Sequence, residues 1–97
     1  MREAEVVERE MACTREDLLR WLPAASGHAP RREDGDEVVL AVSGGEVRLR
    51  AEALPPRRIG AIELPVIALR IRFAGLDAAE REGFLARFDL YTRRGGG

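Results

Sequence analysis

Arginine is the residue type best suited to binding chemistry in this chain. Among its ninety-seven residues all sixteen basic ones are Arg, and there is no Lys, Asn or Gln. Six arginines recur over two neighbouring stretches of the sequence: Arg48, Arg50, Arg57, Arg58, Arg70 and Arg72. A guanidinium group binds phosphate or carboxylate through two parallel hydrogen bonds. These arginines are therefore a candidate surface for a small anionic ligand or a protein partner.

Acidic residues on the same stretches offer an alternative interpretation. Glu46, Glu52 and Glu63 can form cross-strand ion pairs with the arginines and leave a solvated surface without a ligand. No aromatic residue is expected on the face that carries the arginines, and the formal charge of the whole chain is -1. Single-stranded nucleic acid is usually bound by aromatic stacking on a basic surface, so we do not expect a nucleic acid partner.

Cys13 and His28 are the residues best suited to enzymatic chemistry. Cys13 precedes an expected helix start, where backbone N–H groups lower a thiol pKa and favour a nucleophilic thiolate. A single Cys at the end of a strand is more commonly a small buried side chain. His28 lies in a loop of Gly, Ala and Pro, where it can act as a general base. Neither has a partner at motif spacing, so we expect no catalytic residues.

A run of carboxylates from Glu33 to Glu37 is a candidate for a divalent cation. The run lacks the alternating ligand spacing and the bidentate Glu of a calcium loop. We therefore interpret it as a solvated turn, and we expect neither a metal site nor another cofactor.

The three glycines from Gly95 to Gly97 resemble the Gly-Gly tail of ubiquitin-like sulfur carriers. The resemblance implies a carboxylate that is activated as an adenylate. Ubiquitin-like folds, however, end in a strand before these glycines, and here an expected helix precedes them. We interpret residues 95–97 as a helix stop and a flexible tail.

Composition indicates one domain, over residues 1–94. With 45% hydrophobic and 34% charged residues, the chain has apolar material for a single core and charge on its surface. The N-terminal segment is charged and lacks the apolar run of a signal peptide, and no stretch reaches the ~18 apolar residues of a membrane span. We therefore expect a cytoplasmic protein without a membrane partner. The exclusive use of Arg, with many Ala and Gly, suggests a GC-rich bacterial genome.

The first half of the chain predicts a strand, a helix and a hairpin. Residues 5–12 carry an imperfect alternation typical of a strand, and Thr14 can cap a helix over 15–21 that Pro23 ends. Apolar residues then alternate on both sides of a Gly44-Gly45 turn. The turn places Val42 opposite Val47, Leu40 opposite Leu49 and Val38 opposite Ala51. The other face of this hairpin carries Val39, Ala41, Ser43, Glu46, Arg48 and Arg50.

The second half predicts further strands and a terminal helix. Pro55-Pro56 closes the second hairpin strand, because proline cannot donate to a ladder. Residues 58–64 and 66–73 then form two strands around Pro65, or one long strand that bulges there. Arg70 and Arg72 project from the face opposite the apolar side chains. Asp77 begins a helix near the acidic residues that suit its N-terminus, and the helix stops at Arg93 and Arg94.

The resulting fold class is α+β, with two layers and the order β-α-β-β-β-β-α. An antiparallel sheet of four to five strands packs one face against two helices. This order resembles a single repeat of the TATA-binding-protein-like, or helix-grip, architecture. We expect one core cluster between the sheet and the last helix, made of Leu40, Leu49, Leu69, Ile71, Phe84 and Phe88.

These features predict a non-enzymatic binding or protein-interaction module. It would associate with itself, as a homodimer, or with a protein partner through the outer sheet face. The expected binding residues are Arg48, Arg50, Arg58, Arg70 and Arg72. The alternatives are a small enzyme or carrier that uses Cys13, His28 or the glycine tail, and a binder of small apolar ligands between sheet and helix.

Overall fold

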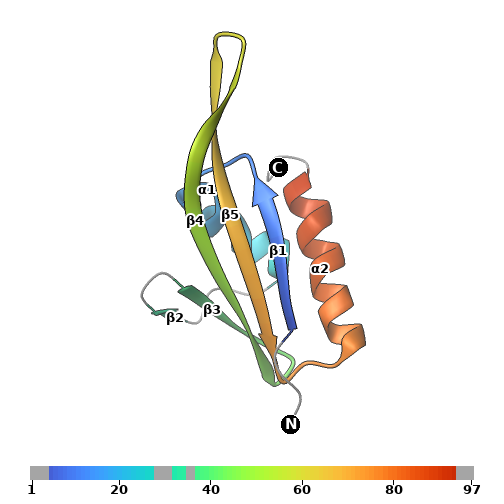
Figure 1. The fold of residues 1–97 in the computed structure, drawn as a ribbon. Helices are drawn as coiled ribbons and strands as arrows, with labels where there is room; N and C mark the ends of the chain where they lie inside the picture. Colours follow the sequence, from blue (N-terminus) through green and yellow to red (C-terminus); the bar gives the residue numbers. More distant parts are fainter. Residues whose placement is uncertain (1–4, 28–31, 35–36, 94–97) are drawn as a thin grey trace.

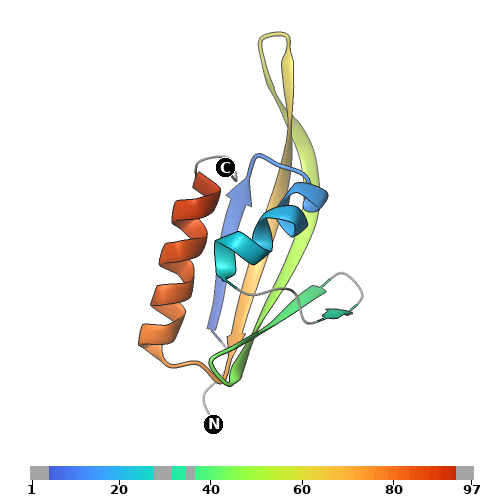
Figure 2. The ribbon, with the colours of Figure 1, turned by 180° about the vertical axis from the view of Figure 1, so that it is seen from behind.

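Two helices lie on one face of a five-stranded antiparallel sheet in the computed structural model, which describes residues 5–27, 32–34 and 37–93 (Figures 1 and 2). The strand order is β1-β5-β4-β3-β2. Along the chain the elements are β1 (Glu5–Met11), α1 (Arg15–Ser26), β2 (Arg32–Asp34), β3 (Glu37–Val42), β4 (Gly45–Ile59), β5 (Ile62–Ala74) and α2 (Ala78–Arg93). The predicted two-layer α+β fold is confirmed. The order β-α-β-β-β-β-α is also observed, but its strands are not all the predicted ones: the sequence does not predict β2, and the strand predicted over 58–64 is wrong, because β4 ends and β5 begins within that range.

Helix α1 begins where the sequence predicts and ends later. Thr14 Oγ1 accepts a hydrogen bond from the Asp17 N–H at 3.0 Å, and Asp17 Oδ2 accepts one from the Thr14 N–H at 3.2 Å. This reciprocal pair satisfies free N–H groups at the helix start. The predicted end at Pro23 is wrong, because the helix continues to Ser26 and buries Ala25 completely. Inside the helix, Pro23 lacks the N–H that would reach the Leu19 carbonyl, and burial of Leu22 and Ala25 offsets this loss.

Helix α2 begins as predicted at Asp77, which caps Ala78–Arg93. Asp77 Oδ1 accepts from the Glu80 N–H at 2.7 Å, and Glu80 Oε1 accepts from the Asp77 N–H at 2.9 Å. This is the same reciprocal cap as at α1. It fixes the point at which the chain leaves β5 and crosses onto the helical layer.

The hairpin of β3 and β4 turns one residue earlier than the sequence predicts. Its turn is Ser43-Gly44, and both residues have positive φ, 50° and 82°. This conformation matches the type I′ turn that suits the twist of a two-residue hairpin. Leu40 therefore pairs with Val47 and Val38 with Leu49, so the predicted register is wrong by two residues. A shift of two preserves the faces, and the same apolar side chains point at the helices.

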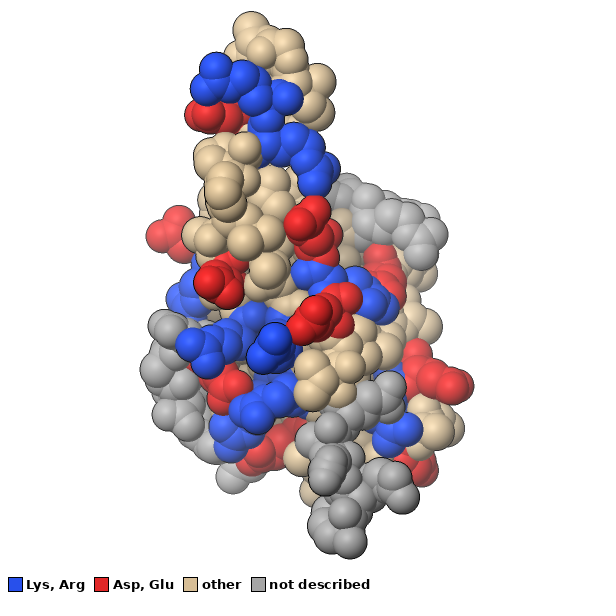
Figure 3. Space-filling view, viewed as in Figure 1, with Lys and Arg blue, Asp and Glu red and all other residues tan. Residues whose placement is uncertain are grey.

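Strand β4 runs through Pro55 and Pro56, so the predicted end there is wrong. The chain reverses at Gly60-Ala61, and β5 then passes Pro65 as one strand. Leu54 pairs with Val66 and Arg57 with Leu64, which leaves two prolines opposite one in a bulge. Ladder hydrogen bonds are interrupted at a bulge, so prolines are tolerated there. We call residues 54–66 the arm, a two-stranded ribbon that projects past both helices (Figures 1 and 3).

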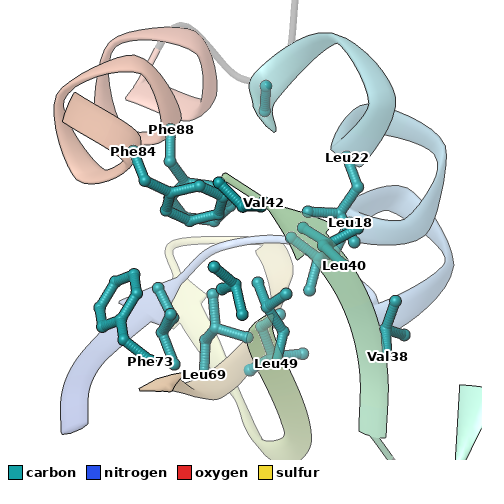
Figure 4. Close-up of a cluster of buried hydrophobic side chains, with 14 of the residues drawn as sticks. Leu18, Leu22, Val38, Leu40, Val42, Leu49, Leu69, Phe73, Phe84 and Phe88 are labelled. Atoms are coloured by element: carbon teal, nitrogen blue, oxygen red, sulfur yellow. The ribbon is translucent and has the colours of Figure 1, made fainter. Parts of the chain in front are cut away.

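The core lies between the sheet and the helices, as expected (Figure 4). All six predicted core residues are buried in one cluster, to which α1 adds Leu18 and Leu22. Phe84 meets Phe73 edge-on at 5.8 Å between ring centroids and stacks on Phe88 at 6.1 Å. Both arrangements are favourable for aromatic rings.

Candidate functional site

The face of the sheet away from the helices, here called the outer face, gathers four of the predicted arginines. Arg48 on β4 pairs directly with Arg72 on β5, and Arg50 pairs with Arg70 one step along. The predicted cluster is thus assembled. Arg58 does not join it, because it lies on the arm, where its Nη2 is 3.2 Å from Glu63 Oε2.

Carboxylates on neighbouring strands separate these like charges. Glu37 on β3 accepts from Arg48 at 3.1 Å and from Arg72 at 2.8 Å, and its side chain is 16% exposed. Glu8 on β1 accepts from Arg70 at 3.0 Å. Directly opposed like charges destabilise a sheet, so these carboxylates stabilise the arrangement. The arginines therefore form cross-strand ion pairs, as in the alternative interpretation of the sequence. Glu37 and Glu8, which that interpretation does not name, accept most of these hydrogen bonds.

The charge of Glu37 is fixed by its two guanidinium partners. Partial burial acts to raise the pKa of this carboxyl group, but hydrogen bonds and charge from Arg48 and Arg72 outweigh it and hold the pKa below the ordinary 4.5. The hydrogen bond from Arg48 to Glu37 in turn raises the pKa of Arg48. Glu37 is therefore ionised at neutral pH and joins strands β3, β4 and β5.

Val39 does not belong to the exposed surface that the sequence predicts. It lies on the outer face opposite Arg48, yet it has no exposed area. Long Arg stems can cover apolar neighbours while their guanidinium groups reach carboxylates, as Arg48 does with Glu37 and Glu46. A partner protein consequently finds charge, and not Val39, on this part of the face.

An open hollow of about 710 Å³ lies on the outer face at the base of the arm. Its lining includes the small side chain of Ala68 on β5, between Arg70 and the start of the arm. Six charged residues line it: Glu8, Arg9, Glu10, Arg50, Glu52 and Arg70. Figure 3 shows acidic side chains on both sides of the uncharged surface at this level. The sequence contains one signal for the hollow. Ala68 is a small residue on β5 between two longer ones of the same face, Val66 and Arg70.

The arm carries a row of apolar side chains on the same side as the outer face. Ile62, Leu64 and Val66 alternate along β5 in the phase of Ala68, Arg70 and Arg72. Leu54 and Ile59 pair with Val66 and Ile62, so they share that side. Ile59 is 56% exposed and Ile62 is 61% exposed. The sequence pattern does not predict this apolar row, because Pro55 and Pro56 indicate that the preceding strand ends before it.

Arg57 is the charged member of this row. Its Nη2 lies 2.9 Å from Glu10 Oε1 on β1, and both side chains are more than half exposed. An exposed ion pair of this kind contributes little to stability and exchanges readily with other partners.

Cys13 is a buried side chain and not an accessible nucleophile. It is 2% exposed, and burial, followed by the charge of Asp17, raises the pKa of its thiol. It adjoins a cavity of about 410 Å³ lined also by Met11, Trp21 and Phe88, with the Arg9–Asp89 ion pair at 2.8 Å on its border. A protonated buried thiol is unreactive. His28 and the tail of residues 95–97 lie outside the described residues.

The interpretation of the acidic run as a solvated turn is wrong where the structure describes it. Glu33 and Asp34 lie in β2, which pairs with β3, and Glu37 lies in β3. The physical reason is that antiparallel pairing with β3 holds these residues in a strand even though their sequence lacks hydrophobic alternation. Within residues 5–27, 32–34 and 37–93, no group of three His, Cys, Asp or Glu side chains is placed to hold a metal ion.

Neither helix in the described part of the chain is long and apolar enough to cross a membrane. No protein-family model, curated protein or solved structure matches the chain. The resemblance to the helix-grip architecture therefore stays a prediction. The surfaces of the molecule provide the basis for a functional proposal.

Proposed function

We propose that this protein is a non-enzymatic interaction module that binds a protein surface through its outer face, with the arm as the main contact. The observation that carries the proposal is the apolar row on the arm. Ile59 and Ile62 each expose more than half of their surface at its tip, on the side continuous with the outer face. Exposed contiguous apolar surface with a polar border is typical of protein-binding sites.

The construction of the arm supports the same proposal. A two-stranded ribbon without a covering layer is marginally stable in water. In the described part of the chain neither helix covers the arm (Figure 2). A protein partner that packs on the apolar row would supply the missing layer and stabilise the ribbon.

The other candidate functions have weaker support. Three carboxylates and three guanidinium groups line the hollow, and Arg9 among them pairs with Asp89, so its charge does not favour a small anion. Arg48, Arg70 and Arg72 already donate to carboxylates of the same chain, and a ligand would have to replace these bonds. An enzyme based on Cys13 would need a thiolate, which burial disfavours.

Site-specific photo-crosslinking in cells tests the proposal. A photoreactive amino acid replaces Ile59 in one strain and Leu90, which is 54% exposed on α2, in a control strain. We expect a discrete protein adduct at position 59 and none at position 90. Equal labelling at both positions, or no adduct at position 59, would contradict the proposal.

A further inference from the structure

We infer that the partner of the arm is a second copy of this chain, bound face to face and antiparallel, so that the arm tip of each copy lies in the hollow of the other. This inference rests on the proposed function and adds the identity of the partner and the register of the contact. Its basis is an exposed apolar projection and a hollow on one continuous face of the same molecule.

The alternation along β5 places the arm tip and the hollow on one face. Ile62, Leu64, Val66 and Ala68 point to the same side, each two residues from the next. A two-fold axis that passes beside Pro65 brings Ile62 over Ala68 of the second copy. Leu64 then lies over Val66 of that copy, which is buried in its own chain and adds little contact. Ala68 is the position where the face is hollowed, by about 710 Å³. An exposed isoleucine therefore meets the space that a small residue leaves.

The arginines of the two copies stay apart in this arrangement. The same axis places Arg48 and Arg72 beyond the tip of the other arm, so the like charges of the two sheets do not oppose each other. An axis through the middle of the sheet would instead stack arginines on arginines, at a large cost. The observed distribution of charge favours contact through the arms and disfavours contact through the body of the sheet.

Arg57 gains acidic neighbours in this arrangement. Because Arg57 pairs with Leu64 and Leu54 pairs with Val66, the same axis places Arg57 of one copy over Leu54 of the second copy. Glu52 of the second copy lies two residues from that Leu54, on the same face. Its existing partner Glu10 borders the same hollow, and the 2.9 Å pair between them is exposed. Arg57 can therefore exchange an ion pair within its own chain for one between copies. Because the axis is two-fold, each of these contacts forms twice, and the assembly closes as a dimer.

Sedimentation of the purified full chain at micromolar concentrations is the first test. We expect a dimer, and we expect Ile62→Glu to weaken it about 30-fold or more, because it places a charge in the apolar contact. Leu90→Glu is the matched control, since Leu90 has similar exposure on α2, and it should leave the dimer unchanged. Circular dichroism of both variants verifies that they fold. A wild-type chain that stays monomeric, or equal weakening by the two variants, overturns the inference.

Cross-linking tests the register. The variant Ile62→Cys/Ala68→Cys is treated with a bis-maleimide shorter than the ~20 Å that separates these positions along one strand. Linkage must then occur between copies, and we expect a covalent dimer. The control Ile62→Cys/Ala74→Cys lies on the same strand and face, but position 74 has no counterpart in the proposed contact. Dimers of equal yield from both variants would show that the register is wrong.

The two sets of tests separate the two proposals. A monomeric purified chain that nevertheless forms an adduct with a different protein at position 59 in cells overturns the second-copy inference and supports the interaction module. A monomeric chain without any adduct overturns both.

Discussion

The outer face has two regions, the body of the sheet and the arm, and the same two strands pass through both. In the body, the helices cover the inner side, and the outer side carries charged residues that bond to one another, such as Glu37 with Arg72 at 2.8 Å. On the arm, neither described helix covers the ribbon, yet the side continuous with the outer face carries Ile59 and Ile62. The difference shows that the body is complete within one chain. The arm has the surface of an element that lacks its covering layer.

The largest effect should come from the covered region. Phe88→Ala removes a side chain that has no exposed area and stacks on Phe84, so we expect the free energy of unfolding to fall by ~3–5 kcal/mol. Urea denaturation measures it. Leu90→Ala, two residues along the same helix and 54% exposed, is the control and should change the value by less than ~0.5 kcal/mol. Comparable losses would mean that the buried face of α2 is assigned wrongly.

A smaller effect should come from the carboxylate that joins three strands of the body. Glu37→Gln leaves Arg48 and Arg72 without their shared anion, and we expect a loss of about 1 kcal/mol at pH 7 after allowance for solvent screening. The pKa of Glu37 is lower in the folded chain than its ordinary 4.5. Its contribution is therefore fully present above about pH 4.5 and is lost as pH falls through the folded-state pKa.

Urea denaturation near pH 7 and near pH 3 measures this dependence. The gap in stability between wild type and Glu37→Gln should narrow at the lower pH. Glu82→Gln, on an exposed position of α2, is the control and should show a small gap at both. A gap for Glu37→Gln that is the same at both pH values would contradict the assigned charge network.

Arg72→Ala should have a weaker effect than Glu37→Gln. Glu37 keeps Arg48 as a partner at 3.1 Å, and the Arg72 side chain is partly exposed, so we expect a loss of ~0.5 kcal/mol or less. The same denaturation experiment measures it. A larger loss than for Glu37→Gln would show that Arg72 stabilises the sheet through its stem, and not through its charge.

The smallest effect on folding should come from the arm. Ile59→Ser/Ile62→Ser removes apolar groups that are mostly exposed, and we expect the free energy of unfolding of the monomer to change by less than ~0.5 kcal/mol. Hydrogen exchange of the dilute chain should also be fast at amides 57–64 and slow at 69–73, since a bare ribbon opens locally. Equal protection in the two segments would remove the distinction between body and arm.

The parts of the fold that sequence predicts well are those that depend on alternation. The turn of the first hairpin is predicted one residue late, yet Leu40 and Leu49 are still assigned to the core. Because side chains alternate with a period of two, an error of two in register leaves every face unchanged. The capping residues Thr14 and Asp77 are likewise predicted, since their hydrogen bonds are local in sequence.

The parts that sequence predicts poorly depend on contacts between distant segments. In the middle of a sheet, a proline such as Pro55 would end the strand. Here Pro55 lies in a bulge on a projecting ribbon, and local sequence does not reveal that position. The partners of the arginines show the same limit. Arg48 and Arg72 are correctly placed on one face, whereas their shared anion Glu37 lies in a run without hydrophobic alternation. Its role depends on the pairing of β3 with β4.

The proline bulge of the arm has a further consequence, for the growth of fibrils. Beyond Arg50, β4 has no neighbour on its β3 side among the residues that the structure describes, so its backbone could template a strand from another molecule. Pro55 and Pro56 have no backbone N–H, so the ribbon has fewer donors at this level. Pro65 removes another donor from β5 at the same level. An incoming strand meets an interrupted row of donors, so the arm can expose isoleucines while resisting stacking into amyloid.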